Sequence, residues 1–358
     1  MKAAVFSFSL RGAELSKRIS EYLYNIGYEV YNQTISKYAE PSKLKPMLPD
    51  HNAACAKAFD CCKAIIFVGA TAIAVRTIAP LIRSKLTDPA VLSVDERGNF
   101  VIPLLSGHIG GANELARCVA ANLGAVACIT TATDVNKLFA VDEWAVRNNM
   151  VLCSLKAAKD FAAALVDNQT VGLYLDKDFV ISGPLPKHVK QDLTLPIGMA
   201  ITLDKEIMPF AITVRLLPRI LHLGIGCRRN ISLDAIENLV FQNFTKLHLD
   251  RRCICSISTV DLKKDEKALL AFATKYKIPI KFYTAQALNQ VLGEFTSSNF
   301  VKNIVGVDNV CERSAVLDSC SGRLLLRKTA LNGVTLAIAA EKLVLDFTKT
   351  DLNLSIND

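Results

Sequence analysis

Apolar and polar positions along the first 148 residues switch repeatedly between two periods. Residues 2–9 and 64–68 are nearly continuous apolar runs, which is typical of strands buried on both faces. Between them, apolar residues recur at helical spacing over residues 15–26. Residues 99–105 repeat the strand pattern, and a helix with apolar positions on one side follows. This alternation predicts an N-terminal, mostly parallel, helix-covered α/β sheet with a ligand crevice at the carboxyl ends of its strands.

The pattern changes after residue 148. A helix is predicted over residues 155–165, followed by short strands near residues 171–175, 199–203 and 212–216. A second strand and helix series opens at residue 220, and Asn332-Gly333 predicts a type I′ hairpin turn near its end. We therefore expect four parts: an N-terminal α/β domain (1–148), a small connecting α+β module (149–217), a second α/β domain (218–350) and a tail (351–358).

Composition narrows the class of protein. Of the 358 residues, 51% are hydrophobic and 21% charged, which excludes a largely disordered chain. The net charge of +8 favours anionic partners. Basic residues form no run longer than a doublet such as Arg228-Arg229 and lack the aromatic interleaving of a single-strand platform, so we expect no nucleic-acid partner. A polyanionic small molecule fits better.

The same sequence predicts a cytoplasmic protein without a membrane span. Its longest nearly apolar stretch, residues 64–75, falls short of the roughly 18 residues that a bilayer requires, and the apolar run before Arg11 is interpreted as a strand rather than a signal peptide. The eleven cysteines form no disulfide pattern, which indicates reduced thiols. The five histidines form no close pair, so a zinc site would have to be assembled from distant positions, and we expect no protein-bound metal.

The most informative motif joins the strand at residues 99–105 to the next helix. It holds three glycines around His108, which let backbone amides face an anion at the positive end of a helix. Imidazole has an unperturbed pKa of about 6.5 and is suited to proton transfer near neutrality. The alternative interpretation is a tight turn whose histidine is satisfied by the backbone.

A second junction contains Gly69, Thr71 and Arg76. Because it follows another strand of the same domain, we expect its hydroxyl and amides to face the same crevice. Arg76 is suited to a bidentate grip on a carboxylate. The alternative is an ordinary turn followed by an exposed helix arginine.

Two further junctions lie in the C-terminal domain. The first resembles half of a dinucleotide fingerprint, but Asn230 replaces its third glycine and Asp261 comes too late for the acidic partner, so a nucleotide role is weak. Its Arg228 still suits an anion. In the second junction, Cys311 stands near a helix start, where a thiol pKa can be lowered; the alternative is a packed cysteine.

Taken together, these motifs resemble the cobalt-precorrin-5A hydrolase family over nearly the whole chain, and least in the connecting module. The N-terminal motifs that carry the resemblance are residues 67–76, 95–96, 104–114 and 130–134. The C-terminal motifs are residues 223–229, 261–266 and 305–312, in the family's order.

The resemblance implies a step of anaerobic, cobalt-early vitamin B12 synthesis. The enzyme would open the ring A δ-lactone of cobalt-precorrin-5A and release acetaldehyde, giving cobalt-precorrin-5B. The partner would be a tetrapyrrole with many carboxylates, and no cofactor is implied because the substrate carries the cobalt. Other enzymes of the pathway are candidate partners, and a homodimer stays open.

We hypothesise that His108 deprotonates the attacking water, with Glu114 orienting it. The amides of Gly107, Gly110 and Gly111 would hold the lactone oxyanion, with Thr71 assisting. The full set of candidate substrate-binding residues is Gly69, Thr71, Arg76, Ser106, Gly107, Gly110, Gly111, Asn113, Gly226, Cys227, Arg228, Cys311 and Glu312.

Two other functions remain as alternatives. A non-catalytic carrier of corrinoid intermediates would bind substrate and product alike and release no acetaldehyde. A nucleotide-dependent oxidoreductase would change nicotinamide fluorescence on titration, and the incomplete fingerprint argues against it.

Overall fold

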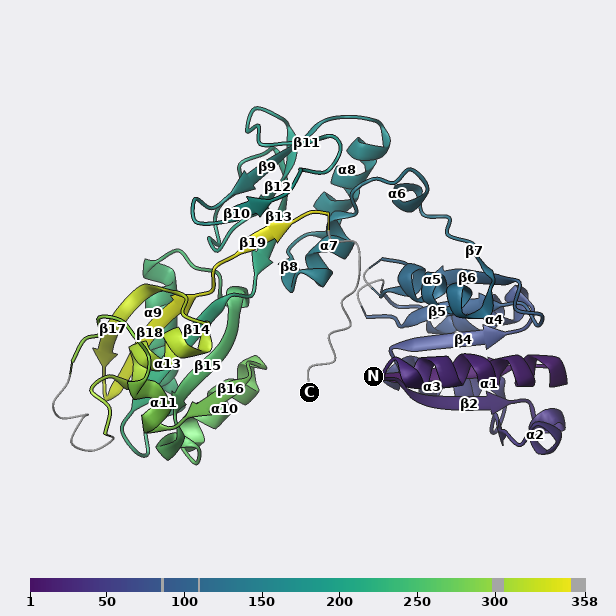
Figure 1. Cartoon of the computed structure of the whole chain (residues 1–358), viewed down its shortest axis with the longest axis horizontal. Coiled ribbons are helices and arrows are strands. Elements are labelled where there is room, and N and C mark those ends of the chain that lie inside the picture. The colour runs from purple at the N-terminus through teal and green to yellow at the C-terminus, as the bar shows by residue number, and fades with distance from the viewer. Residues whose placement is uncertain (85–86, 109, 298–305, 349–358) are drawn as a thin grey trace. The chain divides into compact units, whose positions relative to one another are not determined.

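A computed structural model of the protein describes residues 1–84, 87–108, 110–297 and 306–348. It divides into two compact units, Met1–Glu143 and Trp144–Thr350, which are described separately (Figure 1). The predicted tail at 351–358 lies outside the described residues. Within the described ranges, every helix falls short of the length or apolarity needed to cross a bilayer.

The N-terminal unit is built on one seven-stranded sheet with the order β3-β2-β1-β4-β5-β6-β7. Its strands are β1 (Lys2–Ser7), β2 (Glu29–Thr34), β3 (Lys45–Pro46), β4 (Ala64–Val68), β5 (Ala90–Val94), β6 (Phe100–Leu105) and β7 (Val126–Ala127). Its helices are α1 (Leu10–Asn25), α2 (Ser36–Ser42), α3 (His51–Cys61), α4 (Thr71–Ile78), α5 (Ala112–Leu123) and α6 (Ala132–Val135), and α7 (Val141–Arg147) crosses the boundary between the units.

The sheet is covered on both faces, as its apolar strands predict. Alternate residues of β1 enter different cores: Ala3 and Val5 pack with α1 and α5, whereas Ala4 and Phe6 pack with α3 and α4. The period-2 alternation of a strand therefore supplies both hydrophobic layers at once. The fold class predicted for this part of the chain is confirmed.

The direction of β6 departs from the prediction. Strands β1 to β5 run parallel, but β6 pairs antiparallel with β5, so that Leu105 lies beside Val91 near the start of β5. The loop after β6 consequently leaves the sheet at the edge opposite the carboxyl end of β4, where Gly69 donates to the carbonyl of Val94. The two junctions do not share a crevice.

The connecting module forms a five-stranded sheet with the order β11-β9-β12-β13-β8. Its elements are β8 (Met150–Leu152), α8 (Leu155–Val166), β9 (Val171–Leu175), β10 (Val180–Ser182), β11 (Val189–Lys190), β12 (Ile197–Ile201) and β13 (Ile212–Pro218). Strands β9, β12 and β13 are parallel and β8 is antiparallel to β13. The outer strand β10 pairs instead with β19 (Val344–Asp346).

The C-terminal sheet has the order β16-β15-β14-β18-β17. Its elements are β14 (Leu221–Cys227), α9 (Leu233–Lys246), β15 (Ile254–Val260), α10 (Lys267–Tyr276), β16 (Ile280–Tyr283), α11 (Ala285–Asn289), α13 (Val310–Asp318), β17 (Arg323–Leu331) and β18 (Val334–Ala340). The predicted hairpin is confirmed, because Asn332 and Gly333 join β17 to β18 with φ values of 48° and 82°.

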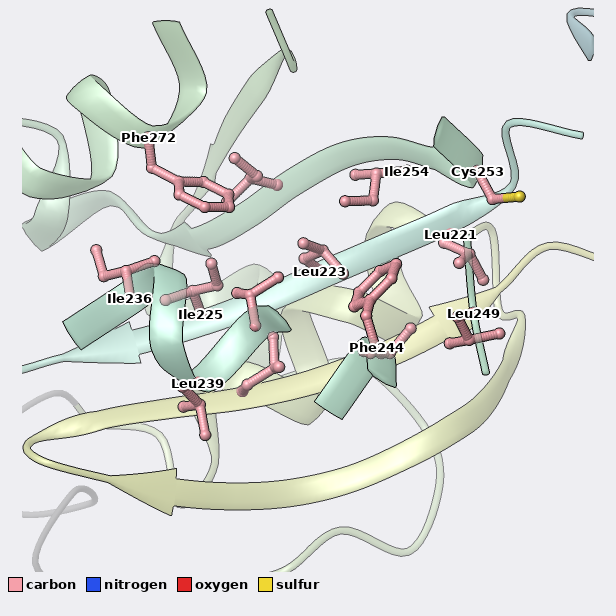
Figure 2. Packing of buried hydrophobic residues seen from close by; sticks show 14 of the residues in the cluster. Leu221, Leu223, Ile225, Ile236, Leu239, Phe244, Leu249, Cys253, Ile254 and Phe272 are labelled. Atoms are coloured by element: carbon pink, nitrogen blue, oxygen red, sulfur yellow. The ribbon is translucent and has the colours of Figure 1, made fainter. Parts of the chain in front are cut away.

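One face of this sheet holds the largest core that the structure describes. Figure 2 shows Leu221, Leu223 and Ile225 of β14 directed at apolar side chains of α9, with Phe272 of α10 beside them. Leu217, from the connecting module, belongs to the same cluster. The shared core explains why the two segments that the sequence separates near residue 217 form one compact unit.

Candidate functional site

In the N-terminal unit, His108 is held between two carboxylates. Its Nε2 lies 3.0 Å from Oδ2 of Asp134, and its Nδ1 lies 3.4 Å from Oδ1 of Asp142. The hydroxyl of Thr133 lies 3.2 Å from the same Nε2. The His108 side chain keeps 17% of its surface exposed, and the two carboxylates 11% and 16%, so the group is sheltered but reachable.

Asp134 is the centre of this cluster. Asp134 lies in the first turn of α6, which follows Thr130 and Thr131. Its Oδ2 accepts hydrogen bonds from Thr131 Oγ1 at 2.5 Å and Asn113 Nδ2 at 2.9 Å. Its Oδ1 accepts from Arg117 of α5. The motifs at residues 104–114 and 130–134, which the sequence could only align in order, are therefore joined through one carboxylate.

The two carboxylates decide the charge of His108. The hydrogen bond to Asp142, the first cause, outweighs burial and raises the pKa of His108 to about 9. Burial raises the pKa of Asp134, but the hydrogen bonds from Thr131, Arg117 and His108 outweigh it and leave that pKa below its ordinary value. At neutral pH the ring is an imidazolium with both nitrogens engaged, which does not fit the predicted role of general base.

Some backbone groups of the loop around His108 are hydrogen-bonded within the loop. The Gly111 amide donates to the His108 carbonyl at 2.9 Å, so it does not face a ligand as predicted. Among the described residues, the Gly107 and Gly110 amides have no acceptor. Ser106, with φ 59°, is buried and donates through Oγ to the carbonyl of Asp88 at 3.0 Å. This hydrogen bond ties the loop to the residue two positions before β5.

Two other predicted residues are positioning groups. Asn113 is buried and directs its amide at Thr131 and Asp134. Glu114 was expected to orient His108, but its carboxylate pairs with Arg117 at 3.2 Å, one turn along α5. The carboxylates that orient the imidazole are Asp134 and Asp142.

The junction after β4 lies apart from this cluster, at the other edge of the sheet. Gly69 has φ 153° and Thr71 shares a hydrogen bond with Ser93 at 3.1 Å, while Arg76 is exposed on α4. A five-residue parallel strand such as β4 separates the two edges by roughly 17 Å. The expectation that Thr71 assists at the His108 loop is therefore wrong.

In the C-terminal sheet, the carboxyl ends of β14 and β15 open into a cavity of about 680 Å³. Four residues of the predicted binding set line it, namely Gly226, Cys227, Arg228 and Cys311. Its further cationic lining residues, which that set does not include, are Arg229, Lys263 and Lys328. Four basic side chains around a partly apolar cavity suit a large ligand with several carboxylates.

Two cysteines line the cavity, and neither has the lowered pKa of an activated nucleophile. Burial raises the pKa of Cys311 to about 11, against the lowered pKa that its place at a helix start had suggested, and burial also raises the pKa of Cys227 to about 11. Glu312 is buried and accepts from Thr296 and from the Lys328 amide, so it holds the local structure instead of facing the cavity.

Asn230 adopts the left-handed backbone conformation that a glycine at this position would allow. Its φ of 57° lies in the left-handed region, where asparagine costs less than other non-glycine residues. The loop between β14 and α9 therefore keeps a turn at this position without the third glycine of the fingerprint.

Sequence reasoning missed three charged members of the N-terminal cluster: Arg117, Asp134 and Asp142. Asp134 lies in a motif that carries the family resemblance, so its position was a usable signal. Arg117 and Asp142 gave no such signal, because their relation to His108 depends on where α5 and α7 pack.

One group of metal-ligating side chains is present among the described residues, in the C-terminal unit. It consists of His222, Cys255 and Glu341. None of the three was predicted as a site residue.

Comparison with known proteins gives matches over most of the chain. The family model described as cobalamin synthesis G N-terminal matches residues 53–134, and the model described as cobalamin synthesis G C-terminus matches residues 221–339. The two matches contain the His108 loop with Asp134 and the whole C-terminal cavity lining.

Curated relatives agree with these matches. The chain is 38% identical to the cobalt-precorrin-5A hydrolase of Salmonella typhimurium, over 79% of this chain and 83% of the relative. It is 32% identical to that of Priestia megaterium, over 78% and 79% of the two chains. A putative cobalamin biosynthesis protein G homolog from Sulfolobus solfataricus, a solved structure, matches at 23% identity with a TM-score of 0.41, over 95% of this chain and 97% of that one.

Proposed function

The chain belongs to the cobalamin synthesis G family of cobalt-precorrin-5A hydrolases, and we propose that it hydrolyses the ring A δ-lactone of cobalt-precorrin-5A and releases acetaldehyde to give cobalt-precorrin-5B. The observation that carries this proposal is 38% identity to a curated enzyme of that name over most of both chains. The joined His108 motifs and the basic C-terminal cavity supply groups that suit such a substrate.

The reaction needs two bond cleavages. Water adds to the lactone carbonyl and the tetrahedral intermediate expels the ring oxygen, leaving a carboxylate and a hydroxyl. Loss of the hydroxyl proton then lets its carbon leave as acetaldehyde, and the electron pair of the broken carbon–carbon bond passes into the conjugated macrocycle. The protein has to supply a proton acceptor, stabilise negative charge on oxygen and hold the substrate.

We assign the stabilisation of negative charge to His108. As an imidazolium it is poorly suited to accept a proton but well suited to donate to an oxyanion. Its longer contact, 3.4 Å from Nδ1 to Asp142, is the one that a lactone oxygen can replace while Asp134 keeps Nε2. Displaced Asp142 would then accept the proton of the attacking water.

Taken by itself, the C-terminal cavity also suits a ligand with several carboxylates. Its volume of about 680 Å³ falls within the ordinary range of sites for large organic ligands, roughly 300–1,000 Å³. Arg228, Arg229, Lys263 and Lys328 provide the charge. Cobalt enters with the substrate, so this reaction requires no resident cofactor.

The test is anaerobic incubation of the purified chain with cobalt-precorrin-5A, followed by an assay for acetaldehyde. We expect stoichiometric aldehyde and the product cobalt-precorrin-5B. Tight binding of substrate and product with no aldehyde would favour the carrier instead.

Two variants separate the assigned roles. His108→Gln removes the cation while keeping a donor of similar size, and we expect kcat to fall about 10²–10³-fold with KM little changed, as for loss of one oxyanion donor. His248→Gln, at an exposed histidine of the other unit, is the matched control. Unchanged kcat in His108→Gln would remove His108 from the mechanism.

We further propose that the enzyme works in the cytoplasm. All eleven cysteines are free thiols in the structure, which suits a reducing compartment. Sedimentation of the purified chain, alone and mixed with enzymes of the pathway, tests the homodimer and the partner enzymes that the sequence leaves open.

A further inference from the structure

The C-terminal sheet contains a second histidine whose two ring nitrogens both meet carboxylates. His222 is the second residue of β14 and is almost fully buried, with Nδ1 2.9 Å from Asp318 Oδ2 and Nε2 2.7 Å from Glu341 Oε1. The reaction proposed above does not use this group, although His222 directly precedes the motif at residues 223–229. A buried histidine with this much negative charge around it requires an explanation.

Cys255 completes the group because the sheet is irregular at this point. Strand β15 pairs regularly with β14 except between Leu221 and His222, where Ile254 faces Leu221 and Ser256 faces His222, so Cys255 is an extra residue. Bulges of this kind are rare between parallel strands and often redirect a side chain at a site. Here the Cys255 sulfur lies within 4.8 Å of both the His222 and the Glu341 ligand atoms.

The exposure of the three side chains leaves a path by which an ion could enter from solvent. His222 is buried, whereas Cys255 and Glu341 are partly exposed, and the Glu341 side chain keeps 40% of its surface open. An ion can therefore reach the group from solvent, and the two outer ligands have room to adjust. The three ligand atoms would have to shift by about 1 Å to bind a zinc ion with bonds of about 2.0–2.3 Å.

Asp318, on the Nδ1 side of His222, is held in place by several hydrogen bonds. Asp318 has a fully buried side chain and accepts from His222 Nδ1, from Ser256 Oγ and, through Oδ1, from the Tyr283 hydroxyl at 2.8 Å; Lys281 Nζ also lies 2.8 Å from that Oδ1. A carboxylate that fixes one ring nitrogen and leaves the other for the ion is the usual outer partner of a metal-bound histidine.

We propose that His222 Nε2, Cys255 Sγ and Glu341 Oε1 bind a divalent transition-metal ion of the Zn²⁺ class, with Asp318 fixing the histidine. One nitrogen, one sulfur and one oxygen ligand suit zinc, and a water would take the fourth position. Binding displaces the proton between His222 and Glu341 and the thiol proton of Cys255, so two protons leave for each ion bound. The ion would tie together β14, β15 and the end of β18.

The experiment uses the full-length chain without a histidine tag, stripped with a chelator and dialysed. Titration with Co²⁺ as a spectroscopic probe should give a thiolate-to-cobalt charge-transfer band that saturates at one ion per chain, and Zn²⁺ should abolish it by competition. Absence of the band, or a band that saturates only in large excess, overturns the proposal.

Variants locate the site. Cys255→Ser should abolish the band, and Glu341→Gln, which keeps size and a polar contact at a partly exposed position, should weaken Zn²⁺ binding at least tenfold. Cys61→Ser, at an exposed cysteine of the N-terminal unit, is the matched control and should change neither. Circular dichroism verifies that each variant is folded. A band that survives in folded Cys255→Ser would place the ion elsewhere and refute the assignment.

Discussion

At the scale of single residues, the environment of His108 matters more than its identity. A loop histidine in isolation is a plausible base, with a pKa of about 6.5. The two aspartates beside it convert it into a cation and so change what it can contribute to lactone opening. The same residue type at position 222 receives similar charge from Asp318 and Glu341, in a setting that we interpret as a metal site instead.

The raised pKa of His108 predicts a pH dependence of stability. Because the folded value, about 9, exceeds the unfolded value of about 6.5, the stabilisation is fully present below pH 6.5 and is lost as pH rises through 9. It amounts to about 3 kcal/mol at most. Chemical unfolding of the chain followed by circular dichroism at pH 6.5 and pH 9.5 measures this loss.

His108→Gln should remove that part of the pH dependence, since glutamine does not titrate. His248→Gln should leave it in place. Equal pH dependence in His108→Gln and the unchanged chain would contradict the charged pair with Asp134 and Asp142.

At the scale of elements, close packing of α13 on β14 explains the need for glycine in the Leu223–Cys227 motif. A Cβ at Gly224 would lie 1.7 Å from the carbonyl oxygen of Cys311, a backbone atom that cannot move without shifting the helix. This approach positions the start of α13 at the mouth of the cavity. Glycine at this position of the motif is therefore required for packing.

Gly224→Ala is expected to destabilise the C-terminal unit by about 3 kcal/mol, the upper part of the usual range for an overpacked core. Gly226→Ala is the matched control in the same strand, because its Cβ would meet only Thr335 Oγ1, at 2.5 Å, a side-chain atom that has more freedom to move. Its expected cost is about 1 kcal/mol. Urea unfolding compares the two, and equal costs would argue against the helix contact.

At the scale of the whole molecule, each compact unit has its own hydrophobic core. The N-terminal sheet is covered on both faces, and the C-terminal core extends into the connecting module through Leu203 and Leu217. Helix α7 contributes side chains to both units. Its Asp142 lies beside His108, and the ring of its Trp144 stacks on the ring of Phe347 with centroids 4.7 Å apart. A division of the chain therefore has to keep α7 in each piece.

Fragments 1–148 and 141–358, each containing α7, are expected to fold cooperatively on their own. The second fragment contains the basic cavity, so we expect it to retain binding of cobalt-precorrin-5A, measured by the absorbance change of the macrocycle, and to release no acetaldehyde. Binding confined to fragment 1–148 would instead place the macrocycle on the His108 unit.

The sequence by itself determined the elements and the family. Apolar runs such as Ala64–Val68 and the Asn332-Gly333 turn are local signals, because burial period and positive φ depend on the residues themselves. The motifs at residues 104–114 and 130–134 carried the family resemblance, because a resemblance is read from the order of residues along the chain. The boundary predicted near residue 217 was not a boundary of packing, because the core crosses it.

Only the tertiary structure decided the chemistry of the sites. The reversal of β6 moved Thr71 to the other edge of the sheet from His108, and the packing of α6 and α7 supplied Asp134 and Asp142 in place of Glu114. Strand direction and the meeting of distant side chains depend on how elements pack, and the charge of a histidine follows from its neighbours in space rather than from its neighbours in the chain.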